Sequence, residues 1–316
     1  MRIFVTGATG FLGRAVVAEL RKRGHQLVGW VRSVPSARTR LGTEVELVEI
    51  GAGEPALRGA LARCDAVLNL AGEPVLSRWT ESRRAALRAS RVDLTARLVS
   101  ALAASDRRPR VLVSGSAVGV FGDRGAERLT ESSPPGSGFL AELCVAWEEA
   151  ARRAEDAGAR VVLLRTGIVL GRGGGALAQM LTPFRLGVGG RLGSGEQFMP
   201  WIHLDDWVRA TVLALIDERA HGPLDLTAPD PPTNREFTRT LARVLRRPAL
   251  FPVPGFALRA LFGEAGSVLL ESQRAIPARL AELGFAHAFP ELEPALRDLL
   301  TERASAVGKS PAAGKA

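Results

Sequence analysis

Short apolar runs of strand length alternate with amphipathic stretches along the first half of the chain. The runs are mainly apolar, which is typical of strands buried on both faces of a parallel sheet, and the stretches carry apolar residues at helical spacing. The strands are expected at 2–6, 26–31, 45–50, 66–70, 110–114 and 160–165, and helices at 14–23, 54–63, 80–104, 139–157 and 234–246. The alternation predicts an α/β fold, a doubly wound parallel sheet with helices on both faces.

The pattern changes after Gly167. The stretches 171–175 and 187–195 are rich in glycine and lack a clear period, so residues 171–200 are expected to form either a substrate-side loop or a plain connection. Beyond Pro231 the chain becomes helical and punctuated by proline. We therefore expect a main domain at 1–230, a small, mostly helical C-terminal domain at 231–304, and a disordered tail of small, polar and basic residues at 305–316.

Gly7, Gly10 and Gly13 lie three residues apart between the first expected strand and the first helix. Glycine at these positions lets the chain turn sharply, lets backbone N–H groups approach a pyrophosphate, and lets the helix pack closely on its strand. The start of the helix also offers unpaired N–H groups and the positive end of its dipole to phosphates. A strand, a glycine turn and a helix in this order predict a dinucleotide-binding site.

The residues that follow each apolar run are candidates for a site, because ligands bind beyond the carboxyl ends of the strands in an open parallel sheet. Arg32 and Ser33 follow the second run. An arginine suits the 2′-phosphate of NADP, so NADP is favoured over NAD; the alternative is that Arg32 only ends a strand in an arginine-rich chain. Ser114 ends the fifth run and Ser116 lies two residues beyond it. Ser116 either hydrogen-bonds a substrate oxygen or satisfies backbone groups in a turn.

Composition limits the classes of protein and partner. The chain has 316 residues, 46% of them hydrophobic, and a formal net charge of +9 that arginine carries almost alone. The basic residues are dispersed, so no nucleic acid partner is expected. No apolar run approaches the roughly 20 residues that span a membrane, and we expect a cytoplasmic protein without a membrane partner. Cys64, Cys144 and four scattered histidines predict neither disulfides nor a metal site.

A set of motifs in chain order resembles a known family, the extended short-chain dehydrogenases/reductases. These motifs are GATGFLG at 7–13, NLAG at 69–72, VSGSA at 113–117, LRTGIVLG at 164–171 and WIHLDD at 201–206. The atypical, epimerase-like branch of that family is resembled in GEPVLSRWTESRR at 72–84, SAVGVFGDRG at 116–125, FLAELCVAWE at 139–148 and NREFTRTLARVLRRP at 234–248. Some members of the branch are labelled cell-division inhibitors.

The resemblance implies an NADP-binding Rossmann domain with a small helical C-terminal domain. In the last motif of the first set, Asp205 or Asp206 is expected to cap the N-terminus of a helix. The expected cofactor contacts are Gly7, Thr9, Gly10, Phe11, Leu12, Gly13, Arg32, Ser33, Leu70, Ala71, Gly72, Arg91, Ser114 and Thr166.

The chain lacks the acid/base pair of that family. Extended short-chain reductases use a tyrosine with a lysine four residues on along one helix face, where the lysine lowers the tyrosine pKa. This chain contains no tyrosine, and alignment of the helix at 139–157 puts Leu140 and Cys144 at the two positions. Glu142 on the same helix is either a replacement acid or a solvated residue. Cys144 is expected to be a small buried residue rather than a nucleophile.

Two functions follow from these residues. The first is an NADP(H)-dependent oxidoreductase or epimerase that acts on a small carbonyl or hydroxyl substrate, sugar-linked compounds included, with Ser116 orienting the substrate oxygen and Glu142 as a second catalytic candidate. The second is a non-catalytic NADP-binding sensor or partner-binding regulator. The chain has neither a G-x-S-x-G elbow nor a Gly-Lys-Ser/Thr phosphate loop, which argues against α/β-hydrolases and P-loop NTPases.

Overall fold

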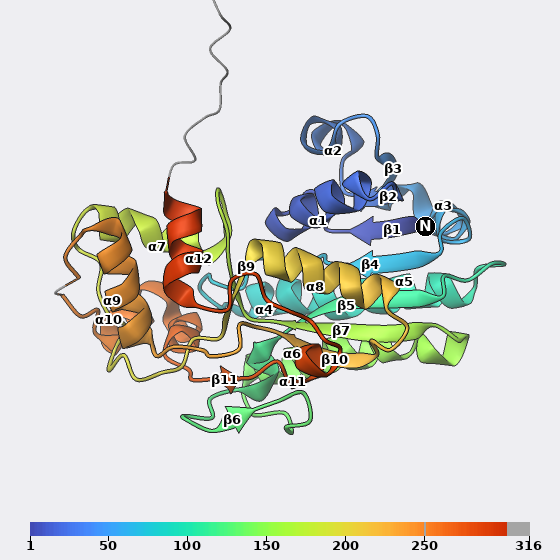
Figure 1. Cartoon of the computed structure of the whole chain (residues 1–316). Helices are drawn as coiled ribbons and strands as arrows, with labels where there is room; N and C mark the ends of the chain where they lie inside the picture. The colour runs from blue at the N-terminus through green and yellow to red at the C-terminus, as the bar shows by residue number, and fades with distance from the viewer. Residues whose placement is uncertain (250, 302–316) are drawn as a thin grey trace, which may run out of the picture.

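The computed structural model describes residues 1–249 and 251–301. Within this part of the chain, parallel strands form a seven-stranded central sheet in the order β10-β7-β5-β4-β1-β2-β3 (Figure 1). The strands are β1 Arg2–Thr6, β2 Gln26–Val31, β3 Glu46–Glu49, β4 Ala66–Asn69, β5 Val111–Ala117, β7 Arg160–Thr166 and β10 Gly222–Leu226. The order runs outward from β1 in both directions, which confirms the predicted doubly wound α/β fold.

Helices cover both faces of the sheet because its central strands bury both faces. Ile3 and Val5 of β1 belong to one core cluster, which includes residues of α1 and α8, and Phe4 belongs to a second, which includes residues of α3, α5 and α6. Figure 1 shows α1 and α8 on the side of the sheet nearer the viewer. The bounds are α1 Phe11–Lys22, α2 Val34–Leu41, α3 Gly53–Leu61, α4 Glu81–Arg88, α5 Leu94–Ala103, α6 Phe139–Arg152 and α8 Leu204–Ile216.

A smaller, mostly helical region lies beside the carboxyl ends of the strands (Figure 1). Its core contains Trp201, Phe237 and Leu296. This helical C-terminal region was expected, whereas the boundaries 1–230 and 231–304 stay predictions, and the tail at 305–316 lies outside the described residues. The remaining elements are β6 Arg128–Leu129, β8 Ile168–Leu170, α7 Gly175–Arg185, β9 Trp201–His203, α9 Asn234–Leu245, α10 Gly255–Phe262, the 3-10 helix η5 Gly263–Leu269, β11 Arg274–Ala275, α11 Ala278–Glu282 and α12 Leu292–Leu300.

Two expectations about local structure need correction. The segment 171–200, expected as a loop or a connection, contains the helix α7, because the run between its two glycine-rich stretches has enough helix-forming residues for three turns. The N-cap of α8 is His203, whose Nδ1 accepts a hydrogen bond from the Asp205 backbone N–H at 3.1 Å, and not Asp205 or Asp206. Asp206 lies in the first turn of α8, where its carboxylate accepts hydrogen bonds from other groups.

The helix expected at 80–104 is one continuous run with an irregular middle. A π-helical turn, Ala89–Asp93, joins α4 to α5 and shifts the faces that the two helices present. Over the described residues, none of the helices combines the length and the apolar character needed to cross a membrane.

Candidate functional site

The glycine turn between β1 and α1 packs so closely against neighbouring backbone that only glycine fits at two of its positions. Gly7 has a φ of +66°, and a Cβ atom on it would lie 2.6 Å from the Leu70 carbonyl oxygen. A Cβ on Gly13 would lie 2.1 Å from the Gly7 carbonyl oxygen, so α1 can approach the turn only with glycine there. Gly10 caps α1 without a side-chain hydrogen bond. The first-turn N–H groups of α1 therefore remain available to an anion.

A buried hydrogen-bond network fixes the strand ends beneath this turn. The hydroxyl of Thr6 donates to Asn69 Oδ1 at 2.7 Å and accepts from the backbone N–H groups of Leu70 and Ala71. The Asn69 amide nitrogen donates in turn to the hydroxyls of Thr95 and Ser114. Because all of these partners are held by the sheet and by α5, the floor of the site is rigid.

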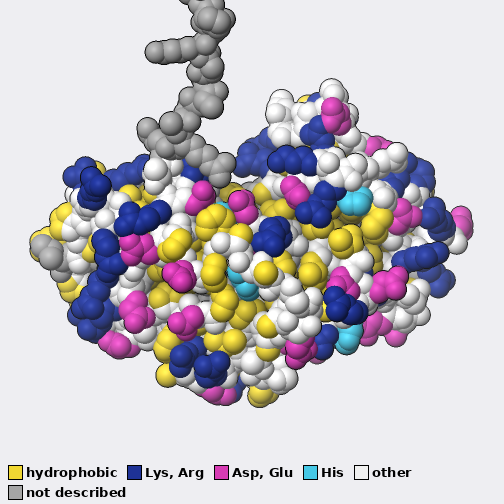
Figure 2. Space-filling view, viewed as in Figure 1, with side chains coloured by type: hydrophobic (Ala, Val, Ile, Leu, Met, Phe, Trp, Pro, Cys, Tyr) yellow, Lys and Arg dark blue, Asp and Glu magenta, His cyan; other side chains and the backbone are white. Residues whose placement is uncertain are grey.

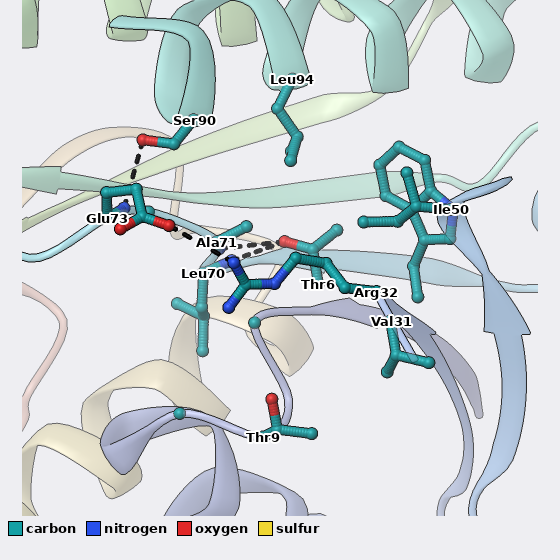
Figure 3. Close-up of a pocket in the computed structure, with 14 residues that line it drawn as sticks. Thr6, Thr9, Val31, Arg32, Ile50, Leu70, Ala71, Glu73, Ser90 and Leu94 are labelled. Carbon is teal, nitrogen blue, oxygen red and sulfur yellow. Dashed lines mark hydrogen bonds and ion pairs between the residues drawn. The ribbon is translucent and has the colours of Figure 1, made fainter. Parts of the chain in front are cut away.

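A pocket of about 220 Å³ lies over this floor (Figure 3). That volume is below the roughly 300–1,000 Å³ of sites for drug-sized ligands, so the pocket suits one end of a dinucleotide rather than the whole molecule. Of the cofactor contacts expected from the sequence, Gly7, Thr9, Gly10, Arg32, Leu70, Ala71 and Gly72 line it. It is also lined by Thr6, Trp30, Val31, Ile50, Glu73, Ser90 and Leu94.

Arg32 stands at the open side of this pocket. It follows β2 directly, its side chain is 87% exposed, and Figure 3 shows it extending toward Glu73. The Arg32 guanidinium lies 3.5 Å from Glu73 Oε1, and the other carboxylate oxygen of Glu73 lies 3.3 Å from Arg83. An arginine that is exposed and held by one loose ion pair can turn to a ligand phosphate at little cost.

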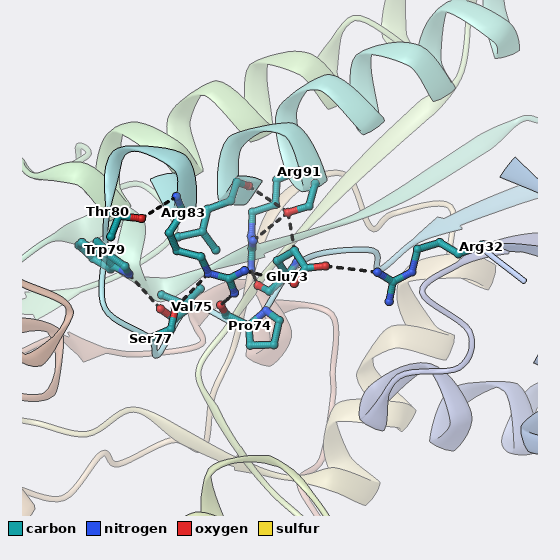
Figure 4. A network of polar contacts seen from close by, with 11 residues as sticks. Arg32, Glu73, Pro74, Val75, Ser77, Trp79, Thr80, Arg83 and Arg91 are labelled. Atoms are coloured by element: carbon teal, nitrogen blue, oxygen red, sulfur yellow. Dashed lines mark hydrogen bonds and ion pairs between the residues drawn. The ribbon is translucent and has the colours of Figure 1, made fainter. Parts of the chain in front are cut away.

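Glu73 belongs to a loop that α4 and the π-helical turn hold in place (Figure 4). Its backbone N–H donates to the Ser90 hydroxyl at 3.1 Å, and its carbonyl accepts from Arg91 at 2.9 Å. Arg83 donates to Ser77 at 3.0 Å and to the Pro74 carbonyl. Arg83 and Arg91 thus fix the wall of the pocket opposite Arg32.

The other expected cofactor contacts lie outside the pocket lining. Ser33 caps α2, Ser114 is fully buried in the floor network, and the Thr166 hydroxyl accepts from Trp207. Arg91 packs over the Trp147 ring, and burial lowers the pKa of its guanidinium. The remaining three, Phe11, Leu12 and Gly13, form the first turn of α1, where their backbone N–H groups face the anion site described above. Their roles as cofactor contacts stay predictions.

Ser116 lies in a different setting from the one its expected role needs. Its hydroxyl donates to Glu148 Oε1 at 2.7 Å, and the Glu148 carboxylate forms a buried ion pair with Arg165 at 2.8 Å and 3.0 Å. Ser116 is 5% exposed, Arg165 5% and Glu148 2%. The hydroxyl is therefore engaged inside the protein, and this geometry lends no support to the predicted contact with a substrate oxygen.

The helix that carries the family's acid/base pair offers no such pair here. Glu142 is exposed, as a solvated helix residue would be, while Leu140 is half-buried and lies near Gly119. Cys144 is buried, and burial raises the pKa of its thiol to about 12. A thiol with that pKa stays protonated at neutral pH, which fits the expected role of a small buried residue. Among the described residues, no group of three or more His, Cys, Asp or Glu is placed to hold a metal.

Several residues that line the pocket were not among the cofactor contacts expected from the sequence. Thr6 ends the first strand, so the rule that ligands bind at strand ends was sufficient to find it. Glu73 follows Gly72 directly, but its place in the pocket could not be predicted from the sequence. It depends on ion pairs with Arg32 and Arg83, which approach the carboxylate from opposite sides. Ser90 lies in the π-helical turn and Leu94 begins α5 directly after it, so both line the pocket from an irregularity that the helical spacing did not predict.

Comparison with known proteins agrees with the fold and motifs. Residues 3–224 match the NAD dependent epimerase/dehydratase family, and residues 253–299 match a domain of unknown function, DUF1731. The chain is 40% identical over 305 residues to the epimerase family protein SDR39U1 of Mus musculus, covering 95% of this chain and 100% of that protein. It is 39% identical over 302 residues to the chloroplastic SDR39U1 homolog of Arabidopsis thaliana, covering 95% and 87% of the two chains.

Solved structures show the same architecture. The human epimerase family protein SDR39U1 (isoform 2), solved with NADPH, superposes with a TM-score of 0.86 at 37% identity and covers 95% of this chain and 99% of that chain. The UDP-glucose 4-epimerase of Thermus thermophilus, at 20% identity and a TM-score of 0.76, covers 95% of this chain and 97% of its own and shares the fold. The glycine turn, the sheet order and these matches together show that the chain belongs to the NAD dependent epimerase/dehydratase family.

Proposed function

We propose that this protein binds NADP(H), with the adenosine end of the cofactor in the pocket between the glycine turn and Arg32. The observation that carries the proposal is the pairing of an open helix N-terminus at Gly10 with an exposed guanidinium at the end of β2, held only by a 3.5 Å ion pair to Glu73. The first suits a pyrophosphate, and the second suits the 2′-phosphate that distinguishes NADP from NAD. The NADPH in the human relative's structure supports the same cofactor.

Thermal unfolding in the presence of each cofactor tests this proposal. A ligand that binds only the folded state stabilises it by RT ln(1 + [L]/Kd), so NADPH is expected to raise the Tm more than NADH at equal concentration. Arg32→Ala is expected to weaken NADPH binding by roughly 10- to 100-fold, the loss of a charge-assisted hydrogen bond, with little change for NADH. Arg40→Ala on α2 removes the same charge from an exposed position away from the pocket and serves as the control. Equal weakening of both cofactors would show that Arg32 does not read the phosphate.

We further propose that the bound cofactor is used by an oxidoreductase or epimerase acting on a small carbonyl or hydroxyl compound, sugar-linked compounds included. NADP(H), when bound, supplies a hydride donor or acceptor. Ser116 and Glu142 are the candidates for holding a substrate oxygen or moving a proton, although Ser116 would first have to leave Glu148. Cofactor oxidation or reduction with a panel of carbonyls and alcohols tests the activity. Loss of turnover in Ser116→Ala, with NADPH binding and Tm kept, would assign the serine to catalysis.

A second candidate function is a non-catalytic NADP-binding sensor or partner-binding regulator. The observation that favours it is the loss of every usual proton donor at once: no tyrosine in the chain, a leucine and a buried thiol at the aligned positions, and Ser116 bound to Glu148. This candidate predicts NADPH binding without turnover on any substrate of the panel.

The two free, buried cysteines fit a reducing compartment, and we keep the cytoplasm as the proposed location.

A further inference from the structure

Two segments of the C-terminal half carry many arginines and no acidic residue. Residues 171–195 contain three arginines, residues 237–263 contain five, and neither contains Asp or Glu. The two segments lie side by side, since the Gly193 N–H donates to the Val253 carbonyl at 2.9 Å and the Val253 N–H donates to the Arg191 carbonyl at 2.8 Å. The segments therefore bring arginines together where Arg191 meets Val253, whereas Arg172 and Arg243 pair with Asp298 and Glu293 of α12.

The same two segments expose large apolar side chains. Among the described residues, five of the eight exposed large hydrophobic side chains belong to these segments, with exposures between 57% and 73%: Leu186, Val188, Phe251, Phe256 and Leu261. The helix α10 accounts for two of them and buries only Leu258. Exposed phenylalanine and leucine side chains in one place mark an interaction surface rather than ordinary scatter.

The arginines around these side chains are free to meet a partner. Arg185, Arg239, Arg246, Arg247 and Arg259 are all exposed, and none has an ion pair within the described chain. Arg239 also lines a small hollow of about 160 Å³ with Arg191 and Arg235, closed on the apolar side by Ala249 and Pro252. Figure 2 shows dark blue and yellow side chains, with some magenta ones between them, at the end of the molecule where Figure 1 places α9 and α10.

The charge decides which partner fits. A second copy of this chain, docked through the same surface about a two-fold axis, would bring unpaired arginines against arginines. A fitting partner carries dense negative charge above an apolar layer. An anionic phospholipid bilayer has this arrangement, because phosphate groups lie over acyl chains, and arginine with phenylalanine and leucine is typical of surfaces that lie in its interface.

We propose that the surface formed by residues 185–191, 239–247 and 251–261 binds anionic phospholipid membranes peripherally, with Phe251 and Phe256 entering the interface and the arginines contacting phosphates. The absence of an apolar run long enough to span a bilayer predicted no membrane partner for this chain. Peripheral binding needs no such segment, only an apolar face with a positive rim. The inference is independent of the cofactor and of any turnover.

Sedimentation of the full chain with vesicles tests the proposal. Binding is expected to phosphatidylcholine vesicles that contain phosphatidylglycerol and not to pure phosphatidylcholine, and it is expected to weaken as salt rises. Arg239→Ser/Arg247→Ser is expected to weaken binding by roughly 30-fold, the effect of two lost phosphate contacts. Phe251→Ser/Phe256→Ser is expected to release the protein into the supernatant. No binding at low salt, or equal binding to both vesicle types, would overturn the proposal.

Matched controls distinguish binding through this surface from non-specific adsorption to vesicles. Arg108→Ser/Arg110→Ser removes the same charge from exposed positions before β5, and Ile216→Ser removes an apolar side chain that is 51% exposed at the end of α8. Both controls are expected to bind vesicles like the original chain, and all variants are expected to keep their Tm. Controls that lose as much binding as the test variants contradict the proposal. So does a dimer, seen by light scattering, that Phe251→Ser/Phe256→Ser converts to monomer.

Discussion

Glu73 controls how freely Arg32 can meet a phosphate. Its carboxylate lies 3.5 Å from the Arg32 guanidinium and, at the edge of the pocket, would repel a 2′-phosphate. Glu73→Gln is therefore expected to tighten NADPH binding by up to about 5-fold, the strength of an exposed ion pair, with a smaller change for NADH. Fluorescence titration with both cofactors measures this. Unchanged or weaker NADPH binding would show that Glu73 instead orients Arg32 for its ligand.

Asp225 makes folding stability depend on pH. It is fully buried on β10, neither carboxylate oxygen has a hydrogen-bond partner among the described residues, and burial first, then Glu131, raises the pKa of this carboxyl well above 3.8. In the folded protein it holds its proton at a pH where the unfolded chain has lost it. The free energy of unfolding therefore falls as pH rises from about 4 toward the folded-state pKa, by up to about 1.4 kcal/mol per pH unit.

Asp225→Asn removes this dependence. The free energy of unfolding of the variant relative to the original chain is expected to grow with pH, and urea unfolding at acidic and neutral pH measures the difference. The exposed Asp230→Asn, on the segment just after β10, serves as the control and is expected to leave the pH profile unchanged. Parallel profiles for Asp225→Asn and the original chain would mean that Asp225 is ionised in the folded protein.

At the scale of the residue, positions whose role depends on local backbone geometry could be predicted from the sequence. Positions whose role depends on residues distant in the chain could not. Gly7 and Gly13 could be found because only glycine avoids the overlaps at those positions. The setting of Ser116 could not be found, because it depends on Glu148 and Arg165, which reach it from α6 and β7. A serine at a strand end has the same sequence signal whether it faces a ligand or a buried carboxylate.

At the scale of the element, α1 and α7 are joined through one aromatic ring. Cβ atoms built on Gly171, Gly174 and Gly175 would lie 2.6, 2.5 and 2.9 Å from the Phe11 side chain, so these glycines form a cradle for it. Phe11 begins α1 at the proposed pyrophosphate site, and Gly175 begins α7. The glycine-rich stretch at 171–175 is thus a contact surface for the helix that begins at the proposed pyrophosphate site.

Gly174→Ala tests the cradle because its extended backbone, with φ at −178°, accepts any residue. The new methyl group would meet the Phe11 ring, and the free energy of unfolding is expected to fall by about 1–3 kcal/mol. Phe11→Ala/Gly174→Ala is expected to lose less than the two single changes added together, since the second change removes the clash. Gly59→Ala on α3, where a Cβ has no neighbour within 4 Å, is the control and should not destabilise. Additive losses would place the cost elsewhere.

Some helices and strands could likewise be predicted from the local sequence pattern, and others could not. Buried strands such as β2 and β7 follow directly from their apolar runs, and the helix starting at Asn234 follows from the spacing of its apolar residues. The strand β10 was missed because it begins Gly-Pro and carries the buried Asp225. This segment forms a strand because it pairs with β7, and the local sequence pattern does not predict that pairing.

At the scale of the whole molecule, the segment 278–289 returns from the small helical region to the main core before α12 rejoins that region. Leu280 and Leu283 lie in the same cluster as β1, β10 and α8, and the His287 ring contacts the Thr227 carbonyl at 2.9 Å. These residues, which lie between β11 and α12, thereby cover the edge strand β10. A chain ending at 230 would uncover this part of the core, so the described parts are expected to unfold together.

Asp206 holds this returning segment in place and provides the test. Its buried carboxylate accepts the backbone N–H groups of Ala288 at 2.8 Å and Phe289 at 2.9 Å. Asp206→Ala leaves both donors without an acceptor and is expected to lower the free energy of unfolding by roughly 2–5 kcal/mol, whereas the exposed neighbour Asp205→Ala should change it by less than about 0.5 kcal/mol. Calorimetry is expected to show one transition, shifted to lower temperature, for Asp206→Ala. Two separate transitions would mean that the returning segment unfolds independently and that the core clusters do not couple the molecule into one cooperative unit.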